Sequence, residues 1–168
     1  MFLQFLRKLN SSAMYVQIWE NRIKITDIQS GDCFDEEPLV AIRKPAKGTQ
    51  AIVAIGNKAH QAVGPDVILV NPFSHPRSLI SDFPVGEKLL NYIFKELSRS
   101  STFRPSPQVV IQPMEKTEGG LTGTEYRAFR ELAAGAGARD VVVYQGAVLD
   151  RHLFDFMKIK ADWENHQG

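Results

Sequence analysis

The most regular feature of the chain is a pair of stretches near its start in which apolar and polar residues alternate. Residues 14–18 and 23–28 follow this pattern, and the short segment Trp19–Arg22 separates them. A period of two is typical of strands with one buried face, so two such runs around a short turn predict a β-hairpin. The acidic segment 32–38 predicts a turn-rich joint. Further short patterns predict strands at 39–43, 51–55 and 67–70, and a short helix at 57–63.

The second half of the chain changes to a helical spacing. Apolar residues recur at helical intervals over 82–99, over 122–136 and through 147–163, which predicts three helices. Between them, 108–112 and 140–144 are short and apolar on both faces, as parallel strands inside an α/β sheet are. The order predicts an α/β domain, a mixed sheet flanked by helices, with a small inserted subdomain carrying its own sheet at 35–80.

Composition narrows the class of protein. The 168 residues are enough for one domain with a core, and 43% hydrophobic against 23% charged residues is typical of a globular chain. A net charge of +1 argues against a dedicated nucleic-acid binder, which would rely on attraction to phosphates. The single cysteine, Cys33, cannot form an internal disulfide, which fits a reducing cytoplasm. No apolar run approaches the roughly 20 residues of a membrane-spanning helix.

Residues 1–10 form an apolar segment that leaves two interpretations open. On a helix, one broad side would carry Phe2, Leu3, Phe5, Leu6 and Leu9, while Arg7 and Lys8 lie largely elsewhere. Such a helix could lie in a membrane interface, with its two cations at anionic headgroups. It could equally pack on its own domain or fray in solution. The segment is too short for the apolar core of a signal peptide, and its charges follow the apolar residues.

Five segments, in order along the chain, resemble the bacterial actin MreB. Glu36–Arg43 is similar to the family's Asn-Glu-Pro-Ser-Val-Val-Ala-Ile, and Val53–Ala59 to its Ala-x-Gly-x-x-Ala. Ile80–Leu90 is similar to Ile-Ala-Asp-Phe followed by Thr-Glu-Lys-Met-Leu. Phe103–Pro107 is the most literal match, and Glu125–Arg139 resembles a helix with the Gly-Ala-Arg turn after it. Together the segments cover roughly residues 1–150 with nearly the family's spacing.

The resemblance implies an actin-like (ribonuclease H-like) fold. Residues 11–34 and 81–150 would form subdomain IA, and 35–80 the inserted subdomain IB. Residues 1–10 would be a membrane-binding segment, as MreB proteins often have, and 151–168 a C-terminal helix and polar tail. The family's domain II, with its second phosphate loop and adenine pocket, has no counterpart in this sequence, so half of the ATP site is expected to be missing.

The turn that grips ATP in the family, Asp-x-Gly-Thr, is degenerate here. The aspartate position is Gln17, the glycine is Trp19 and the threonine is Glu20. Glycine lets backbone amides approach a phosphate, whereas tryptophan blocks that approach and glutamate repels a polyanion. We therefore expect no ATP and no magnesium as cofactor. Glu20 is interpreted as a tolerated turn residue, and Trp19 either as another or as an exposed contact for a partner.

Glu125 is the only retained catalytic candidate. The resemblance aligns it with the glutamate that orients the attacking water, but Thr122–Glu125 also reads as a capping box, and we favour that structural role. The family's Glu-Glu-Pro is replaced by Gln145–Ala147, another departure at the cleft. The four histidines are scattered without metal-ligand spacing, so no metal site is predicted.

These observations favour a protein without enzymatic activity that acts by protein contact in cell-shape biology. The resemblance implies an MreB filament or a second copy as partner, in the cytoplasm and peripherally at the inner membrane. Candidate contact residues lie on the longest predicted helix and the loop after it: Glu87, Lys88, Asn91, Lys95, Phe103 and Arg104. Two alternatives remain, a nucleotide-binding half-site completed by a partner chain that supplies domain II, and a membrane-anchored scaffold.

Overall fold

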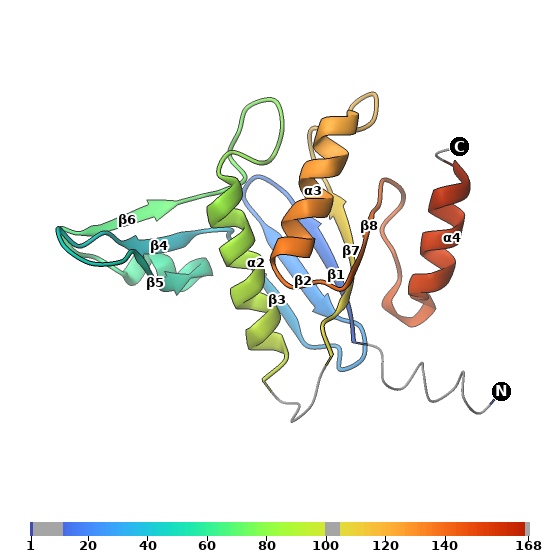
Figure 1. Cartoon of the computed structure of the whole chain (residues 1–168), viewed down its shortest axis with the longest axis horizontal. Helices are drawn as coiled ribbons and strands as arrows, with labels where there is room; N and C mark the ends of the chain where they lie inside the picture. The colour runs from blue at the N-terminus through green and yellow to red at the C-terminus, as the bar shows by residue number, and fades with distance from the viewer. Residues whose placement is uncertain (2–11, 100–104, 167–168) are drawn as a thin grey trace.

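A computed structural model describes residues 1, 12–99 and 105–166, and its centre is a five-stranded mixed sheet (Figure 1). The strand order is β3-β2-β1-β7-β8, where β1 pairs antiparallel with β2, and parallel with β7, which in turn pairs parallel with β8. The strands are β1 (Ala13–Ile18), β2 (Ile23–Asp27), β3 (Cys33–Glu36), β7 (Gln108–Pro113) and β8 (Asp140–Val143). The predicted hairpin and the two predicted parallel strands are thereby confirmed.

The alternation of side chains along β1 divides the sheet into two covered faces. Met14, Val16 and Ile18 are fully buried on one face, in the cluster that includes the apolar sides of α2 (Phe83–Leu97) and α3 (Gly123–Gly135). Tyr15 points to the other face, where it joins Phe156 of α4 (Phe156–His166). Because successive strand residues face opposite ways, one buried strand supplies both cores. Figure 1 shows α2 and α3 side by side and α4 apart from them, beyond β7 and β8.

A second, three-stranded sheet lies to one side of the first (Figure 1). It consists of β4 (Val40–Arg43), β5 (Ala51–Ile55) and β6 (Val67–Val70) in the order β5-β4-β6, with the 3₁₀ helix η1 (Gly56–Gln61) after β5. The chain returns to the first sheet through a connector, residues 71–81. Phe73 in this connector is fully buried and lies close to Gly86, where an added Cβ would come within 3.5 Å of the Phe73 ring.

The prediction of a joint at 32–38 is wrong, because Cys33–Glu36 is strand β3. It pairs antiparallel with β2 at the edge of the sheet. Its polar side chains are stabilised by opposite charges across the pair, since Asp35 lies opposite Lys24 and also binds Arg22. Charged residues on an edge strand also discourage unwanted pairing with other chains.

The continuous helical pattern predicted through 147–163 is also wrong at its start. Residues 147–150 are not helical, a short 3₁₀ helix η2 spans Arg151–Leu153, and α4 begins only at Phe156. Asp150 ends the extended stretch by accepting a hydrogen bond from the His152 amide at 2.8 Å. The helix predicted at 57–63 is a 3₁₀ helix at 56–61, and the ends of α2 and α3 lie one or two residues inside the predicted ones.

Several predictions fall on residues outside the described part of the chain. These are the apolar segment 2–9 and the contact candidates Phe103 and Arg104. Among the residues that the structure describes, none of the helices has the length and apolar character needed to cross a membrane.

Candidate functional site

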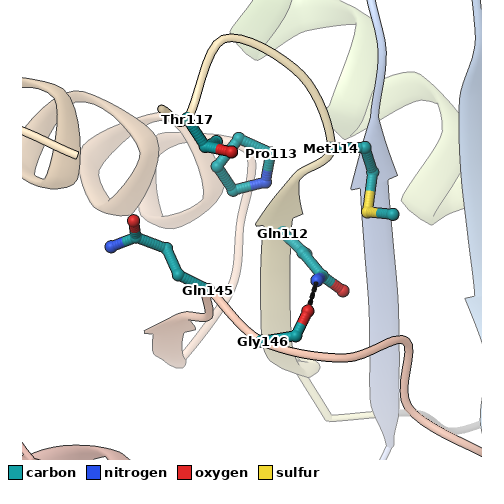
Figure 2. A pocket seen from close by; sticks show the side chains of 6 residues that line it. All are labelled: Gln112, Pro113, Met114, Thr117, Gln145 and Gly146. Atoms are coloured by element: carbon teal, nitrogen blue, oxygen red, sulfur yellow. Dashed lines mark hydrogen bonds between the residues drawn. The ribbon is translucent and has the colours of Figure 1, made fainter. Parts of the chain in front are cut away.

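The carboxyl ends of β1, β7 and β8 lie along one edge of the sheet, because these three strands are parallel. Ligands of open α/β sheets bind at this kind of edge. Three loops follow the strands there: the turn Trp19–Arg22, residues 114–118 and residues 144–147. Figure 2 shows an open pocket of about 360 Å³ among two of them. It is lined by Gln112, Pro113, Met114, Thr117, Gln145 and Gly146.

The amide side chains of this pocket are bonded within the chain. Gln112 Nε2 donates to the Gly146 carbonyl at 2.7 Å, as Figure 2 shows, and its Oε1 accepts from the Tyr15 hydroxyl. The Tyr15 oxygen in turn accepts from the Leu149 amide at 3.3 Å, and burial raises the pKa of Tyr15 above its usual value. Gln145 Oε1 accepts from the amide of Leu121 at 2.9 Å. The pocket therefore holds its own loops together through neutral groups.

Gln17 lies beside Gln112 in the parallel pair of β1 and β7. Its side chain is 5% exposed, and its Nε2 donates to the sulfur of Met114 at 3.9 Å. Burying a carboxylate here would require a cation or several donors, whereas burying a neutral amide costs less free energy. The end of β1 is therefore built for a neutral side chain.

The turn after β1 is closed and covered by its own side chains. The Trp19 amide donates to the Arg22 carbonyl at 2.8 Å, and the Arg22 guanidinium lies 4.9 Å from the centre of the Trp19 ring. Arg22 also binds both carboxylate oxygens of Asp35, at 2.6 and 2.7 Å, and these hydrogen bonds lower the pKa of Asp35. Contact of Trp19 with a partner stays a prediction.

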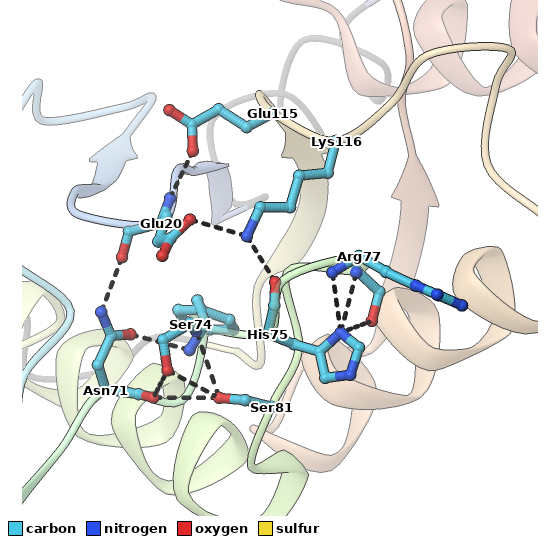
Figure 3. Close-up of polar contacts among 10 residues, drawn as sticks. Glu20, Asn71, Ser74, His75, Arg77, Ser81, Glu115 and Lys116 are labelled. Carbon is cyan, nitrogen blue, oxygen red and sulfur yellow. Dashed lines mark hydrogen bonds and ion pairs between the residues drawn. The ribbon is translucent and has the colours of Figure 1, made fainter.

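Glu20 is more than the tolerated turn residue that we expected, because it is the centre of a polar network (Figure 3). Its carboxylate pairs with the Lys116 ammonium at 2.8 Å, and its backbone N–H donates to Glu115 Oε2 at 2.9 Å. Its carbonyl accepts from Asn71 Nδ2, also at 2.8 Å. One turn residue thus joins the loop after β7 to the connector that returns from the second sheet.

Lys116 is held in this network from more than one side. Figure 3 shows its ammonium between Glu20 and the His75 carbonyl, to which it also donates. Its side chain is 19% exposed, and its φ of 58° lies in the left-handed region that non-glycine residues rarely adopt. Such a conformation persists when the surroundings fix it. The sequence analysis missed Lys116, since nothing in the pattern around it signals this contact.

Glu125 stands at the start of α3 and forms the expected capping box. Its carboxylate accepts from the Thr122 amide at 2.9 Å, while the Glu125 amide donates to the Thr122 hydroxyl at 3.3 Å. A second contact, from the Thr122 hydroxyl to the Glu125 carboxylate, measures 2.7 Å. The capping prediction is confirmed. Both contacts to the carboxylate go to the same oxygen, Oε2.

The contact candidates on α2 divide into two kinds. Asn91 donates to the Ala136 carbonyl at the end of α3 at 2.8 Å, and Glu87 packs against Gly135, so these two residues face the neighbouring helix. Lys88 and Lys95 are exposed. Tyr92, which the sequence analysis did not single out, lies between these two lysines in the sequence and is 40% exposed. The open surface of α2 is therefore smaller than predicted and contains an aromatic ring.

Metal-ligating side chains do not gather in the part of the chain that the structure describes. Within residues 12–99 and 105–166, no group of three or more His, Cys, Asp or Glu residues could hold a metal ion.

The sheet order, the inserted second sheet and the covering helices define an actin-like α/β domain. Two solved structures share this arrangement. MreB5 of Spiroplasma citri bound to ADP has a TM-score of 0.58 at 18% identity, over 79% of this chain and 38% of that one. The non-polymerising A278D mutant of MamK bound to AMPPNP has a TM-score of 0.60 at 15% identity, over 79% and 40%.

The family is established by sequence. The family model described as MreB/Mbl protein matches residues 20–150, and the chain belongs to this family. The cell shape-determining protein MreB of Haemophilus influenzae is 32% identical over 149 residues, which is 86% of this chain and 41% of that protein. Its Escherichia coli K12 counterpart is 35% identical over 120 residues, 68% and 33%. The chain thus spans a third to two fifths of the length of these relatives.

A relative of another kind has no assigned role. The uncharacterized protein YjaA of Escherichia coli K12 is 28% identical over 130 residues, which is 74% of this chain and 76% of that protein. This match therefore covers about three quarters of both proteins.

Proposed function

We propose that this protein acts in cell-shape biology by protein contact, without ATP chemistry, and that its partner is an MreB filament or a second copy of the chain. One observation supports the proposed absence of ATP chemistry. Polar groups at the carboxyl edge of the sheet already form hydrogen bonds and an ion pair within the chain. Glu20 and Lys116 pair with each other, and Gln112 and Gln145 bind backbone groups of the adjacent loops.

The charges at this edge oppose a nucleotide. A phosphate chain needs free backbone N–H donors and an available cation. Here the Glu20 amide donates to Glu115, and the Lys116 ammonium pairs with Glu20. Two carboxylates against one ammonium leave an excess of negative charge, which repels a polyphosphate at short range. The ADP and AMPPNP of the two solved relatives are therefore not expected to bind here.

The surface for a partner is the exposed side of α2. Lys88, Tyr92 and Lys95 are spaced four and three residues apart, so they share one side of a rigid helix. Tyrosine is a residue that protein interfaces favour, and the two lysines beside it suit the polar rim of an interface. Membership of the MreB/Mbl family supports a filament as the partner, and with it a cytoplasmic location that reaches the inner membrane peripherally.

Charge reversal on α2 tests the contact. We expect the unaltered chain to cosediment with MreB filaments and the Lys88→Glu variant to do so about tenfold more weakly at low salt, because steering and binding by rim charges are lost. Lys158→Glu is the matched control, since Lys158 is exposed on α4 on the opposite face of the sheet. A chain that neither cosediments with filaments nor self-associates contradicts the proposal, and so does equal weakening in both variants.

Calorimetric titration with Mg-ATP tests the absence of nucleotide chemistry. We expect no binding heat up to about 1 mM nucleotide, a concentration at which even weak sites of about 4 kcal/mol are half filled. Repeating the titration with added MreB separates this proposal from a nucleotide half-site that is completed by another chain. The retained Glu125 is the reason for considering such a half-site. Saturable binding by the chain alone overturns the proposal, whereas additional binding that requires both proteins establishes the half-site.

A further inference from the structure

We infer that the turn Trp19–Arg22 and Lys116 form an oxyanion site whose occupants are the chain's own carboxylates, those of Glu20 and Glu115. The inference rests on the proposed function and deepens it, since it names what fills the edge of the sheet in place of a ligand. The chemical class that the site would otherwise accept is a small oxyanion such as inorganic phosphate.

The donors of this site are of the type that binds phosphate. One is a backbone amide, the Glu20 N–H, which lies 2.9 Å from Glu115 Oε2. The other is the Lys116 ammonium, which lies 2.8 Å from Glu20 Oε2. Amides in turns and lysine ammonium groups are common partners of phosphate oxygens. In this chain each of them already binds a carboxylate oxygen (Figure 3).

The donors are also fixed in place, as a preformed site requires. Lys116 combines a left-handed backbone with a mostly buried side chain and a second contact to the His75 carbonyl. Asn71 holds the turn from the connector through the Glu20 carbonyl at 2.8 Å. Asn71 is itself placed by its Oδ1, which accepts from the Phe73 amide at 2.9 Å. Removing the two carboxylates would therefore leave an amide and an ammonium with no need for the backbone to rearrange.

The carboxylates of Glu20 and Glu115 help to make permanent links between three segments of the fold. The network joins the turn after β1, the connector from the second sheet and the loop after β7. When a dissolved ligand makes such links, their strength follows the ligand concentration. When the chain supplies the carboxylates, the links are permanent. The three segments are therefore held in one arrangement at any nucleotide or phosphate concentration.

The test is a gain of phosphate binding on removal of the occupants. In Glu20→Ala/Glu115→Ala, inorganic phosphate at about ten times its dissociation constant should raise Tm by about 3 °C over potassium chloride of equal ionic strength. The unaltered chain should show only the small general rise that phosphate, as an excluded salt, gives to folded proteins, and the rise in the double variant should exceed it. The matched control is Glu96→Ala/Glu131→Ala, which removes the carboxylates of two exposed ion pairs, with Arg99 and Arg127, outside the turn. It should behave like the unaltered chain.

Each outcome with these variants either supports or overturns the inference. A folded double variant, judged by circular dichroism, whose rise in Tm with phosphate is no larger than that of the unaltered chain overturns the inference. Adding Lys116→Met should abolish the phosphate response, and its persistence would also overturn it. Should the double variant not fold, Glu115→Ala alone frees the Glu20 amide and should show a smaller specific rise, whose absence counts against the inference. Mg-ATP binding by the unaltered chain would instead refute the proposed function, so the two failures are distinguishable.

Discussion

Phe156→Ala is expected to lower the free energy of unfolding by about 3 kcal/mol, which corresponds to a fall in Tm of about 8 °C. Phe156 is 5% exposed and lies at the centre of the cluster on the second face of the sheet, with Tyr15, Val110 and Val142. Truncation to alanine removes the apolar contact and leaves a cavity against the sheet. Thermal unfolding followed by far-UV circular dichroism measures the change.

The neighbouring residue provides the control. Met157 follows Phe156 directly in α4 but is 63% exposed, so Met157→Ala should change the free energy of unfolding by less than about 0.5 kcal/mol. Equal effects of the two substitutions would show that the second face of the sheet is not covered by α4 in solution.

The cover on this face bears on where a partner can bind. The family match ends at residue 150, and residues 151–166 lie beyond it. Arg151 in this stretch donates to the carbonyls of Ile28 and Gln29 at 3.0 and 3.3 Å, and Lys160 binds Asp140 at 2.8 Å, so the segment is fastened at both ends. A bare apolar face of this size would be an association site. With the face covered, the exposed side of α2 is left as the better candidate for contact.

The elements with strong periodicity could be predicted from the sequence. The hairpin of β1 and β2 follows from alternation, and α2 follows from a helical row that includes Leu89, Ile93 and Phe94, all of which are buried. The capping box at Thr122 was predictable because both partners lie within one turn of helix, where the spacing alone fixes the contact. In such elements, residues that are close in sequence determine the conformation by themselves.

Other elements depend on contacts that are distant in sequence. Strand β3 has the composition of a loop, and it is a strand because it pairs with β2, where Lys24 lies opposite Asp35, while Arg22 in the turn before β2 binds the same carboxylate. Leu149 looks like a helical position, but the Leu149 amide binds the Tyr15 hydroxyl and the chain there is extended over the sheet. In both cases tertiary contacts decide the conformation against the local preference.

The candidate site shows the same division. The departure of the turn from the family's Asp-x-Gly-Thr could be read from Gln17, Trp19 and Glu20, because residue type alone determines charge and bulk. The network that fills the site could not, since Glu115 and Glu20 are 95 residues apart and meet only through the parallel pairing of β1 and β7. The sequence therefore shows which residues of the turn differ from those of the family, and only the fold shows which contacts these residues make.

Phe73→Ala should be the most damaging single substitution in the chain, with a loss of about 4 kcal/mol in the free energy of unfolding and a fall in Tm of about 10 °C. Phe73 is fully buried against Gly86, where α2 offers no side chain of its own, so the neighbourhood has little with which to fill the cavity. Phe73→Leu, which keeps most of the volume, should cost about a third as much. Urea unfolding of the three proteins measures the series.

The same substitution should also weaken the network at the sheet edge, because loss of the buried ring loosens the backbone of residue 73, whose amide positions Asn71, and Asn71 holds the turn at Glu20. Hydrogen exchange of the Glu20 amide should therefore accelerate more in Phe73→Ala than in Phe94→Ala, a substitution in the same core that lies about two turns along α2 from Gly86. Equal acceleration in the two variants would mean that the connector does not transmit core packing to the turn. A larger acceleration in Phe73→Ala would show that Phe73 stabilises both the turn Trp19–Arg22 and the connector from the second sheet.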